Sequence, residues 1–108
     1  MNEVLYEKLK EVARSRQTTF YSDIAPLADL DMDNPHDRQV IGQLLGEISS
    51  FEHEHGRPLL SAIVVSMQEY SPGKGFFGLA RELGLFNHNN EDDYWVEERD
   101  KVWDYWAP

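Results

Sequence analysis

The sequence feature that most limits how this chain can fold is the mainly apolar run LLSAIVV at residues 59–65. Apolar side chains occupy both faces of the run at a period of two, and Ile63, Val64 and Val65 are β-branched. Such a run favours a strand that is buried on both sides. Pro58 precedes it, and proline suits the start of a strand because it has no N–H to donate. The run therefore predicts a central buried strand.

The sequence PGKGFF, residues 72–77, follows soon after the predicted strand. Clusters of proline and glycine mark turns, and the two phenylalanines indicate a return into packed structure. We expect a glycine-rich turn or wing with Lys74 at its tip. Apolar residues then continue at helical spacing and predict a short helix that ends at Gly84.

Length and composition set the outer limits. A chain of 108 residues with 41% hydrophobic residues can form one domain with a single modest core. The absence of cysteine excludes disulfides, thiolate metal ligands and a cysteine nucleophile, and it favours a cytoplasmic location. The chain has no run of about 18 apolar residues, so we expect no membrane span.

The net charge of -10 argues against a surface that is basic all over. Nucleic-acid binding draws much of its affinity from the neutralisation of phosphates, which handicaps an acidic chain. Charge is uneven, however: residues 91–106 carry seven acids and two bases, whereas residues 1–16 are slightly basic. A local basic patch can therefore still contact nucleic acid.

Three helices are predicted before the apolar run. Residues 4–16 form an amphipathic first helix, and a very short strand at residues 18–21 leads into a short second helix. The third helix is capped by Asn34, continues as an apolar stripe from Val40 to Phe51 and ends at Gly56. Gly42 and Gly46 lie four apart on this helix, where another backbone is expected to approach closely.

The acidic segment DLDMDNPHD, residues 29–37, has the first three ligand spacings of an EF-hand loop. Its sixth position is Asn34 instead of glycine, and its twelfth is Val40 instead of glutamate, so the segment predicts a solvated turn. His53 and His55 are two residues apart and do not share a helix face. We predict no metal site and no cofactor.

The C-terminal part of the chain holds all three tryptophans. A polar loop at residues 87–93 precedes a helical pattern in which Trp95, Val102 and Trp106 share one stripe, broadened by Trp103. The expected organisation is a domain over residues 1–86, then a linker and an amphipathic helix over residues 87–108 that packs on it.

Helices followed by a strand, a glycine-rich turn and a returning segment form the order of a winged helix-turn-helix. The predicted fold class is α+β: a small winged helix-turn-helix of three helices with a short β-hairpin or wing, plus an added C-terminal helix. Residues 19–25, TFYSDIA, resemble the T-Y-G-D-(I or V)-A segment of the alkylguanine-DNA alkyltransferases and their non-catalytic alkyltransferase-like relatives. Residues 38–45, RQVIGQLL, resemble the recognition-helix pattern R-x-V-G-x-x-L of that family with one residue inserted.

The resemblance extends over residues 18–80 and implies a winged-helix frame. Within it, Tyr21 resembles the tyrosine that attends the phosphate of an extruded nucleotide, and Arg38 resembles the arginine that begins the recognition helix. The family's segment P-(C or W)-H-R-V is replaced here by Pro58 and residues 59–61, LLS. Without a cysteine to accept an alkyl group, the alkyltransferase reaction is excluded. The pattern G-R-P-x-L-S-A with P-G-x-G-F also resembles small bacterial segments, some near restriction-type nucleases.

Two functions from different classes fit these features. The first is a non-catalytic bacterial winged-helix module that associates with nucleic acid and binds duplex DNA weakly, with a helix in the major groove and a wing on the backbone. The residues expected to contact nucleic acid are Tyr21, Arg38, Gln39, Gln43 and Lys74.

The alternative is a protein-interaction or oligomerisation module that binds no nucleic acid, with an acidic DNA mimic as a narrower version. Its interface is the C-terminal helix, which would bind a protein partner or a second copy of the chain, because tryptophans are favoured at interfaces. The interface residues are Trp95, Trp103 and Trp106. We expect no catalytic residue, because no base stands at a useful spacing from any serine or threonine.

Overall fold

The computed structural model describes residues 1–87 and 89–108 as a mixed arrangement of helices and a small sheet. The described elements are α1 (Glu3–Arg14), β1 (Thr19–Phe20), α2 (Tyr21–Ile24), the 3-10 helix η1 (Ala25–Ala28), α3 (Pro35–Glu54), the 3-10 helix η2 (Leu60–Ile63), β2 (Val64–Val65), α4 (Lys74–Glu82) and α5 (Glu91–Trp106).

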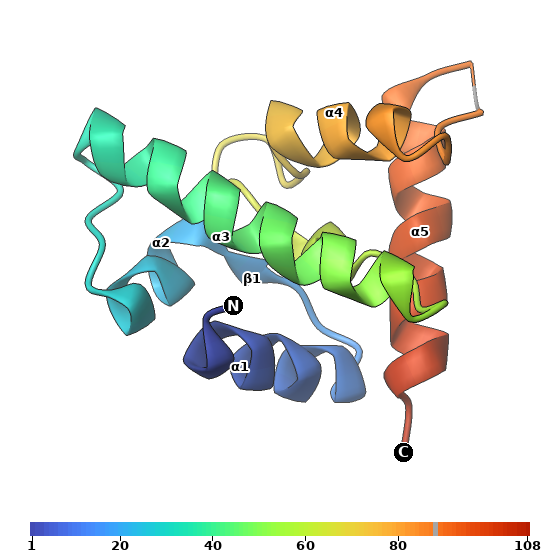
Figure 1. The fold of residues 1–108 in the computed structure, drawn as a ribbon, viewed down its shortest axis with the longest axis horizontal. Helices are drawn as coiled ribbons and strands as arrows, with labels where there is room; N and C mark the ends of the chain where they lie inside the picture. Colours follow the sequence, from blue (N-terminus) through green and yellow to red (C-terminus); the bar gives the residue numbers. More distant parts are fainter. Residues whose placement is uncertain (88) are drawn as a thin grey trace.

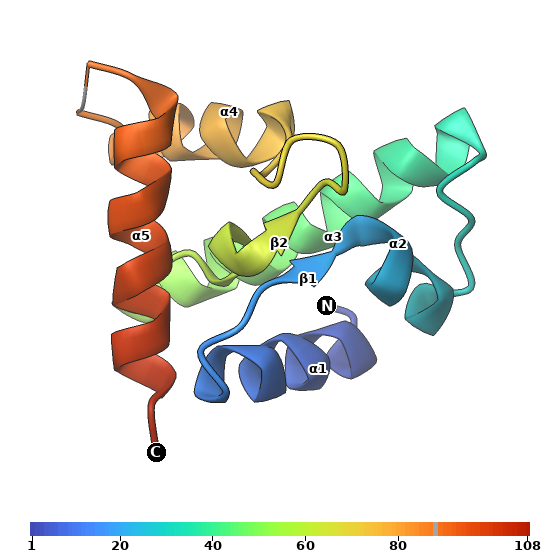
Figure 2. The same cartoon turned by 180° about the vertical axis from the view of Figure 1, so that it is seen from behind.

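The elements surround η2 and the sheet. Figure 1 shows α3 crossing the middle of the molecule, with α4 on one side of it, α1 on the other and α5 upright across their ends. Figure 2, seen from behind, shows β1 and β2 side by side against α3. Helix η2 contacts α1, α3 and α5, so the residues of the predicted central run do lie at the centre of the core.

The predicted long strand is wrong in form. Only Val64 and Val65 form a strand; it pairs in parallel with β1, and the preceding four residues form η2. Buried backbone groups need hydrogen-bond partners, and here side chains supply them. The N–H of Leu59 donates to Glu98 Oε2 at 2.8 Å, and the N–H of Ser61 donates to Ser49 Oγ at 3.0 Å. The N–H groups of Leu59 and Ser61 therefore have hydrogen-bond partners without a neighbouring strand.

The predicted β-hairpin or wing is not found in the described residues. After β2, a turn closed by the Ser66 N–H and the Ser71 carbonyl leads to Gly73, the N-cap of α4. Lys74, expected at a wing tip, is instead the first residue of α4. The helix forms because Phe76, Phe77 and Ala80 place one apolar face on the core.

Several helix boundaries follow the predicted signals, but the predicted polar loop at residues 87–93 is too long, because α5 already begins at Glu91 after its N-cap Asn90; residue 88 of that loop lies outside the described residues. The Asn34 side chain accepts hydrogen bonds from the N–H groups of His36 and Asp37 at the start of α3. Gly56 and Gly84 follow α3 and α4 with φ values of 73° and 74°, a left-handed conformation that glycine adopts without strain. The apolar stripe of α3 places Ile41, Leu45 and Ile48 in the core.

Helix α5 belongs to the same core. It packs across η2 and α1, and its own residue Val102 is fully buried in the core. The indole N–H of Trp95 donates to the Ala62 carbonyl at 2.8 Å, and that of Trp103 donates to the Gln17 carbonyl at 2.9 Å. Of the helices in the described part of the chain, none has the length and apolar character that a membrane crossing requires.

Candidate functional site

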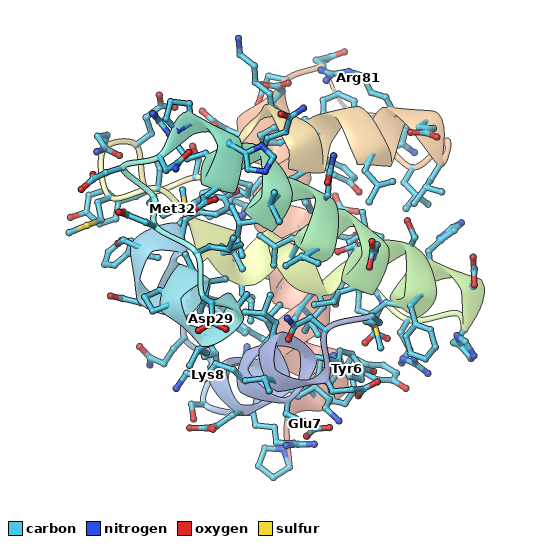
Figure 3. All side chains as sticks on the ribbon, turned by 60° about the vertical axis from the view of Figure 1, so that its left-hand side comes forward. Tyr6, Glu7, Lys8, Asp29, Met32 and Arg81 are labelled. Atoms are coloured by element: carbon cyan, nitrogen blue, oxygen red, sulfur yellow. The ribbon has the colours of Figure 1, made fainter. Side chains whose placement is uncertain are left out.

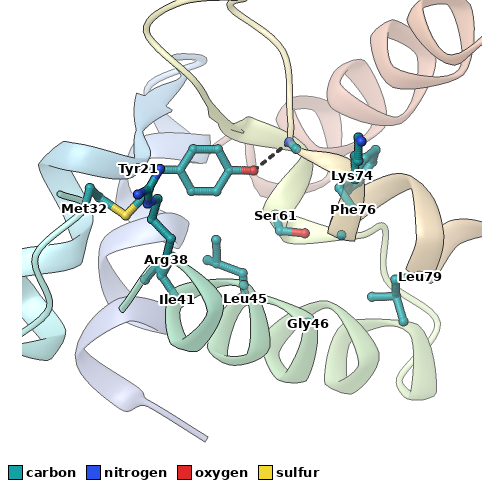
Figure 4. A pocket seen from close by; sticks show the side chains of 13 residues that line it. Tyr21, Met32, Arg38, Ile41, Leu45, Gly46, Ser61, Lys74, Phe76 and Leu79 are labelled. Carbon is teal, nitrogen blue, oxygen red and sulfur yellow. Dashed lines mark hydrogen bonds between the residues drawn. The ribbon is translucent and has the colours of Figure 1, made fainter. Parts of the chain in front are cut away.

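A pocket of about 250 Å³ opens between α3, η2 and the start of α4. Figure 4 shows Tyr21 on one side of it, Phe76 and Lys74 on the other, and Ile41 and Leu45 rising from α3 below. The apolar part of the wall is made of Met32, Ile41, Leu45, Phe76 and Leu79. Polar side chains enter from Tyr21, Arg38, Ser61 and Lys74.

Glycines create much of this space. Gly42, Gly46 and Gly75 line the pocket, and a Cβ atom added at any of them would meet no heavy atom within 4 Å. The expected close approach of another backbone at Gly42 and Gly46 is therefore wrong. These two positions leave one side of α3 open to the pocket.

Tyr21 closes one side of the pocket by a long-range hydrogen bond. Its hydroxyl oxygen accepts from the Gly73 N–H at 2.8 Å, which joins the start of α2 to the start of α4. Burial raises the pKa of the Tyr21 hydroxyl, and the Gly73 N–H offsets part of this rise. The hydroxyl is therefore protonated at neutral pH. Among the described residues no acceptor takes its hydrogen, so it can donate to a ligand.

The inner polar contact of the pocket is a pair of buried serines. The Oγ atoms of Ser49 and Ser61 lie 2.6 Å apart, and Ser61 lines the pocket. Within the described chain, no histidine or carboxylate lines this pocket beside Ser61. A serine nucleophile needs an adjacent base, and the described lining of this pocket places none beside Ser61.

Two cations at the pocket mouth are electrostatically unusual for this chain. Arg38 and Lys74 are exposed, and neither has a carboxylate within 4.0 Å among the residues that the structure describes. Seven of the ten Lys and Arg residues do have such a partner: Lys8, Lys10, Arg16, Arg57, Arg81, Arg99 and Lys101. Lys8, for example, pairs with Glu11 on α1, and Figure 3 shows Lys8 apart from Met32 at the pocket.

The start of α4 adds to this positive character. Asparagine side chains accept hydrogen bonds from the first turns of α1, α3 and α5, whereas no side chain caps α4 at Gly73. The N-terminus of a helix carries a partial positive charge, which favours an anion nearby. The pocket thus combines an apolar interior with positive charge from Arg38, Lys74 and the start of α4.

The other predicted contact residues lie outside this pocket. Gln39 follows Arg38 and Gln43 follows Gly42 on α3, and both glutamines are exposed. They therefore lie beside the residues of α3 that line the pocket, on the side that faces solvent. The residues that the sequence analysis missed are Met32, Ile41, Leu45, Ser61, Gly73, Phe76 and Leu79. The signal that could have indicated a pocket was the repeated glycine, because each one removes a side chain from a packed surface.

The predicted interface tryptophans pack mainly on their own domain. The Arg99 guanidinium lies between two of them, 5.2 Å from the Trp95 ring centroid and 4.6 Å from that of Trp103. Trp106 is partly buried against α1, where Lys10 and Arg14 face its ring. All three tryptophans are thus partly buried by contacts within this chain.

In the described part of the chain, no group of three or more His, Asp or Glu side chains is arranged to hold a metal ion. Comparisons with protein-family models, curated proteins and solved structures find no match to this chain. The candidate site therefore stands on its own geometry and charge.

Proposed function

We propose that this protein is a non-catalytic, DNA-associated module whose pocket holds one nucleotide turned out of a DNA strand. One observation carries the proposal: in an acidic chain, an apolar pocket is lined by two cations that have no carboxylate partner among the described residues and by a tyrosine hydroxyl that can still donate its hydrogen. Proteins that take a base out of its stack hold it between aromatic and apolar side chains. The wall formed by Leu45, Phe76 and Leu79 offers such a surface.

The mouth of the pocket suits the phosphate of that nucleotide. Arg38 offers a planar fork of donors that fits a phosphate, and Lys74 adds a compact positive charge. The Tyr21 hydroxyl reaches the uncapped start of α4 on the side where Lys74 lies, and Arg38 lies across the pocket from Lys74 (Figure 4). These four groups come from three separate segments of the chain, and the Tyr21–Gly73 hydrogen bond fixes two of those segments relative to each other.

The resemblance to alkyltransferase-like proteins supports the same roles for Tyr21 and Arg38. A helix-turn-helix frame remains part of the proposal, with α3 as the helix offered to DNA and Gln39 and Gln43 beside it. The chain has no cysteine, which is why the proposed activity is binding alone. The acidic remainder of the surface repels DNA, so we expect weak binding that is confined to this face.

Fluorescence anisotropy at low salt tests the proposal with a duplex that carries one bulged thymidine. We expect Arg38→Ala and Lys74→Ala each to weaken binding several-fold, while Lys101→Ala on α5 leaves it unchanged. Gly46→Leu fills the pocket and should abolish the preference for the bulged duplex over the perfect one. Gly78→Leu is its control, because Gly78 is equally open and does not line the pocket. No binding at roughly 100 µM DNA would overturn the proposal.

A further inference from the structure

A second pocket, of about 360 Å³, adjoins the first. The two pockets share Tyr21, Met32 and Arg38, so these three side chains form the partition between them. Figure 4 shows Arg38 rising from α3 toward Met32 and Tyr21 at this partition. The remaining wall of the second pocket is made of Ser22, Asp33, Ser66, Met67 and Gln68.

We infer that the second pocket holds the nucleotide next to the one in the first pocket, so that the site recognises two consecutive nucleotides. This inference rests on the proposed function. Its geometric basis is Arg38, which lines both pockets and would face the phosphate that links the two nucleotides. A guanidinium between two base pockets can bind that phosphate through two parallel hydrogen bonds.

The side chains of the second pocket differ from those of the first in a way that suits a base edge. The Ser22 and Ser66 hydroxyls, the Gln68 amide and the Asp33 carboxylate offer both donors and acceptors. Met67 is 56% exposed, and its thioether offers a polarizable surface for the face of a base. The second pocket therefore reads a base more specifically than the apolar first pocket does.

The loop that carries Met67 and Gln68 is held in place by its own hydrogen bonds. The Ser66 carbonyl accepts from the Tyr70 N–H at 2.9 Å, and Ser66 Oγ accepts from the Glu69 N–H at 3.0 Å. The Tyr70 ring packs edge-on against Phe20, with centroids 5.8 Å apart. The Ser22 hydroxyl also contacts the Met67 sulfur at 3.5 Å. This side of the pocket is thus formed before any ligand arrives.

Asp33 determines which base fits. An ionised carboxylate accepts hydrogen bonds and cannot donate them, and it repels phosphate. In the inferred complex, the Asp33 carboxylate therefore faces the edge of the base and not the phosphate. Cytosine presents an amino group that donates to a carboxylate, whereas thymine presents a carbonyl oxygen at the same position. We therefore expect cytosine to be preferred over thymine in the second pocket.

The test is an NMR titration of the ¹⁵N-labelled full chain with thymidine 5′-monophosphate and the dinucleotides d(TpT), d(TpC) and d(CpT). Because the second pocket would contact the additional base, d(TpT) should bind at least about fivefold more tightly than the mononucleotide, the low end of what one further stacked base contributes. One of the two mixed dinucleotides, whichever places its cytosine in the second pocket, should bind more tightly than d(TpT).

Two variants assign the effect to the second pocket. Asp33→Asn should remove the preference for cytosine, because an amide can donate as well as accept. Asp29→Asn is the matched control: it makes the same charge change in the same acidic segment but does not line the pocket, and it should keep the preference. Met67→Ala should weaken dinucleotide binding and leave mononucleotide binding unchanged.

The outcomes separate this inference from the proposed function. If the mononucleotide binds in a manner sensitive to Gly46→Leu but the dinucleotides bind no more tightly, the two-nucleotide site is wrong and the single pocket stands. If neither kind of nucleotide shifts any pocket resonance, both are overturned. If Asp33→Asn and Asp29→Asn alter the cytosine preference equally, Asp33 does not select the base.

Discussion

At the scale of single residues, Glu52 is a fully buried acidic side chain among the described residues. Its side chain is 0% exposed at the end of α3, and its carboxylate is bonded to the Arg57 guanidinium. Removal of one partner from a buried ion pair leaves an uncompensated charge, which typically destabilises a protein by about 3–5 kcal/mol. We expect a loss of this order in the free energy of unfolding for Arg57→Ala, measured by urea denaturation.

The exposed ion pair between Arg81 and Glu91, 3.0 Å apart, provides the control. Pairs of this kind contribute about 0–1 kcal/mol, so Arg81→Ala should lower the free energy of unfolding only slightly. Equal losses for the two variants would show that Glu52 and Arg57 are not a buried pair in solution.

Tyr6 should make the stability of the protein fall at high pH. Burial, with a further contribution from the adjacent Glu52 carboxylate, raises the pKa of Tyr6 from 10.0 to about 12. Between these values the folded state keeps a proton that the unfolded state has lost, so the free energy of unfolding decreases as pH rises. The contribution of Tyr6 is fully present below pH 10 and disappears through the folded pKa.

Urea denaturation from pH 9 to 11.5 measures this effect by comparison with Tyr6→Phe. The phenylalanine variant lacks the titrating hydroxyl, so its stability should decline less steeply by up to about 1.4 kcal/mol per pH unit. Other tyrosines and the lysines titrate in both proteins and cancel in the difference. Parallel pH profiles would contradict the raised pKa.

At the scale of elements, local sequence signals predicted helices better than they predicted the strand. Asn34 caps α3, and Gly56 follows it with a positive φ, because capping depends on groups that are near in sequence. The run from Leu59 to Ile63 includes the 3-10 helix η2, and its backbone partners include side chains of α3 and α5. Nothing within the run indicates that these distant partners exist.

The candidate site was predictable in part. Tyr21 and Arg38 were predicted from a family resemblance, and Lys74 from a wing that the described residues do not form; all three nevertheless line one pocket. Met32 and Ser61 could not be assigned to it, because a thioether in an acidic turn and a hydroxyl in an apolar run have no local signature of a pocket. Their positions depend on how α3, η2 and α4 pack.

Helix α5 should be required for folding. It contributes Tyr94 and Val102 to the core, and its Glu98 and Trp95 side chains satisfy the backbone of Leu59 and Ala62. A chain ending at Asn90 would expose that apolar surface and leave both backbone groups without partners. We expect it to lack cooperative thermal unfolding by circular dichroism, whereas a chain ending at Trp106 should unfold cooperatively. Cooperative unfolding of the shorter chain would return α5 to the role of an added interaction helix.

At the scale of the whole molecule, the distribution of charge limits how DNA can be bound. The chain has 20 acidic and 10 basic residues, and most of the basic ones lie beside carboxylates. A cation that is already paired releases few counterions from DNA. Three cations have no carboxylate partner among the described residues: Arg14, which faces the Trp106 ring away from the first pocket, and Arg38 and Lys74, which line that pocket and can contact DNA there.

The salt dependence of DNA binding should therefore be shallow. Each neutralised phosphate contributes about -0.7 to -0.9 to the slope of log K against log salt, so two cations give a slope no steeper than about -2. Salt also screens the repulsion between DNA and the acidic remainder of the protein, which makes the slope shallower still. Anisotropy titrations from low to moderate salt should give this value for the unmodified protein. The slope should move toward about -1 for Arg38→Ala and stay unchanged for Lys101→Ala. A slope several-fold steeper would mean that DNA displaces carboxylates from the paired cations, and the contact face would then extend well beyond the two pockets.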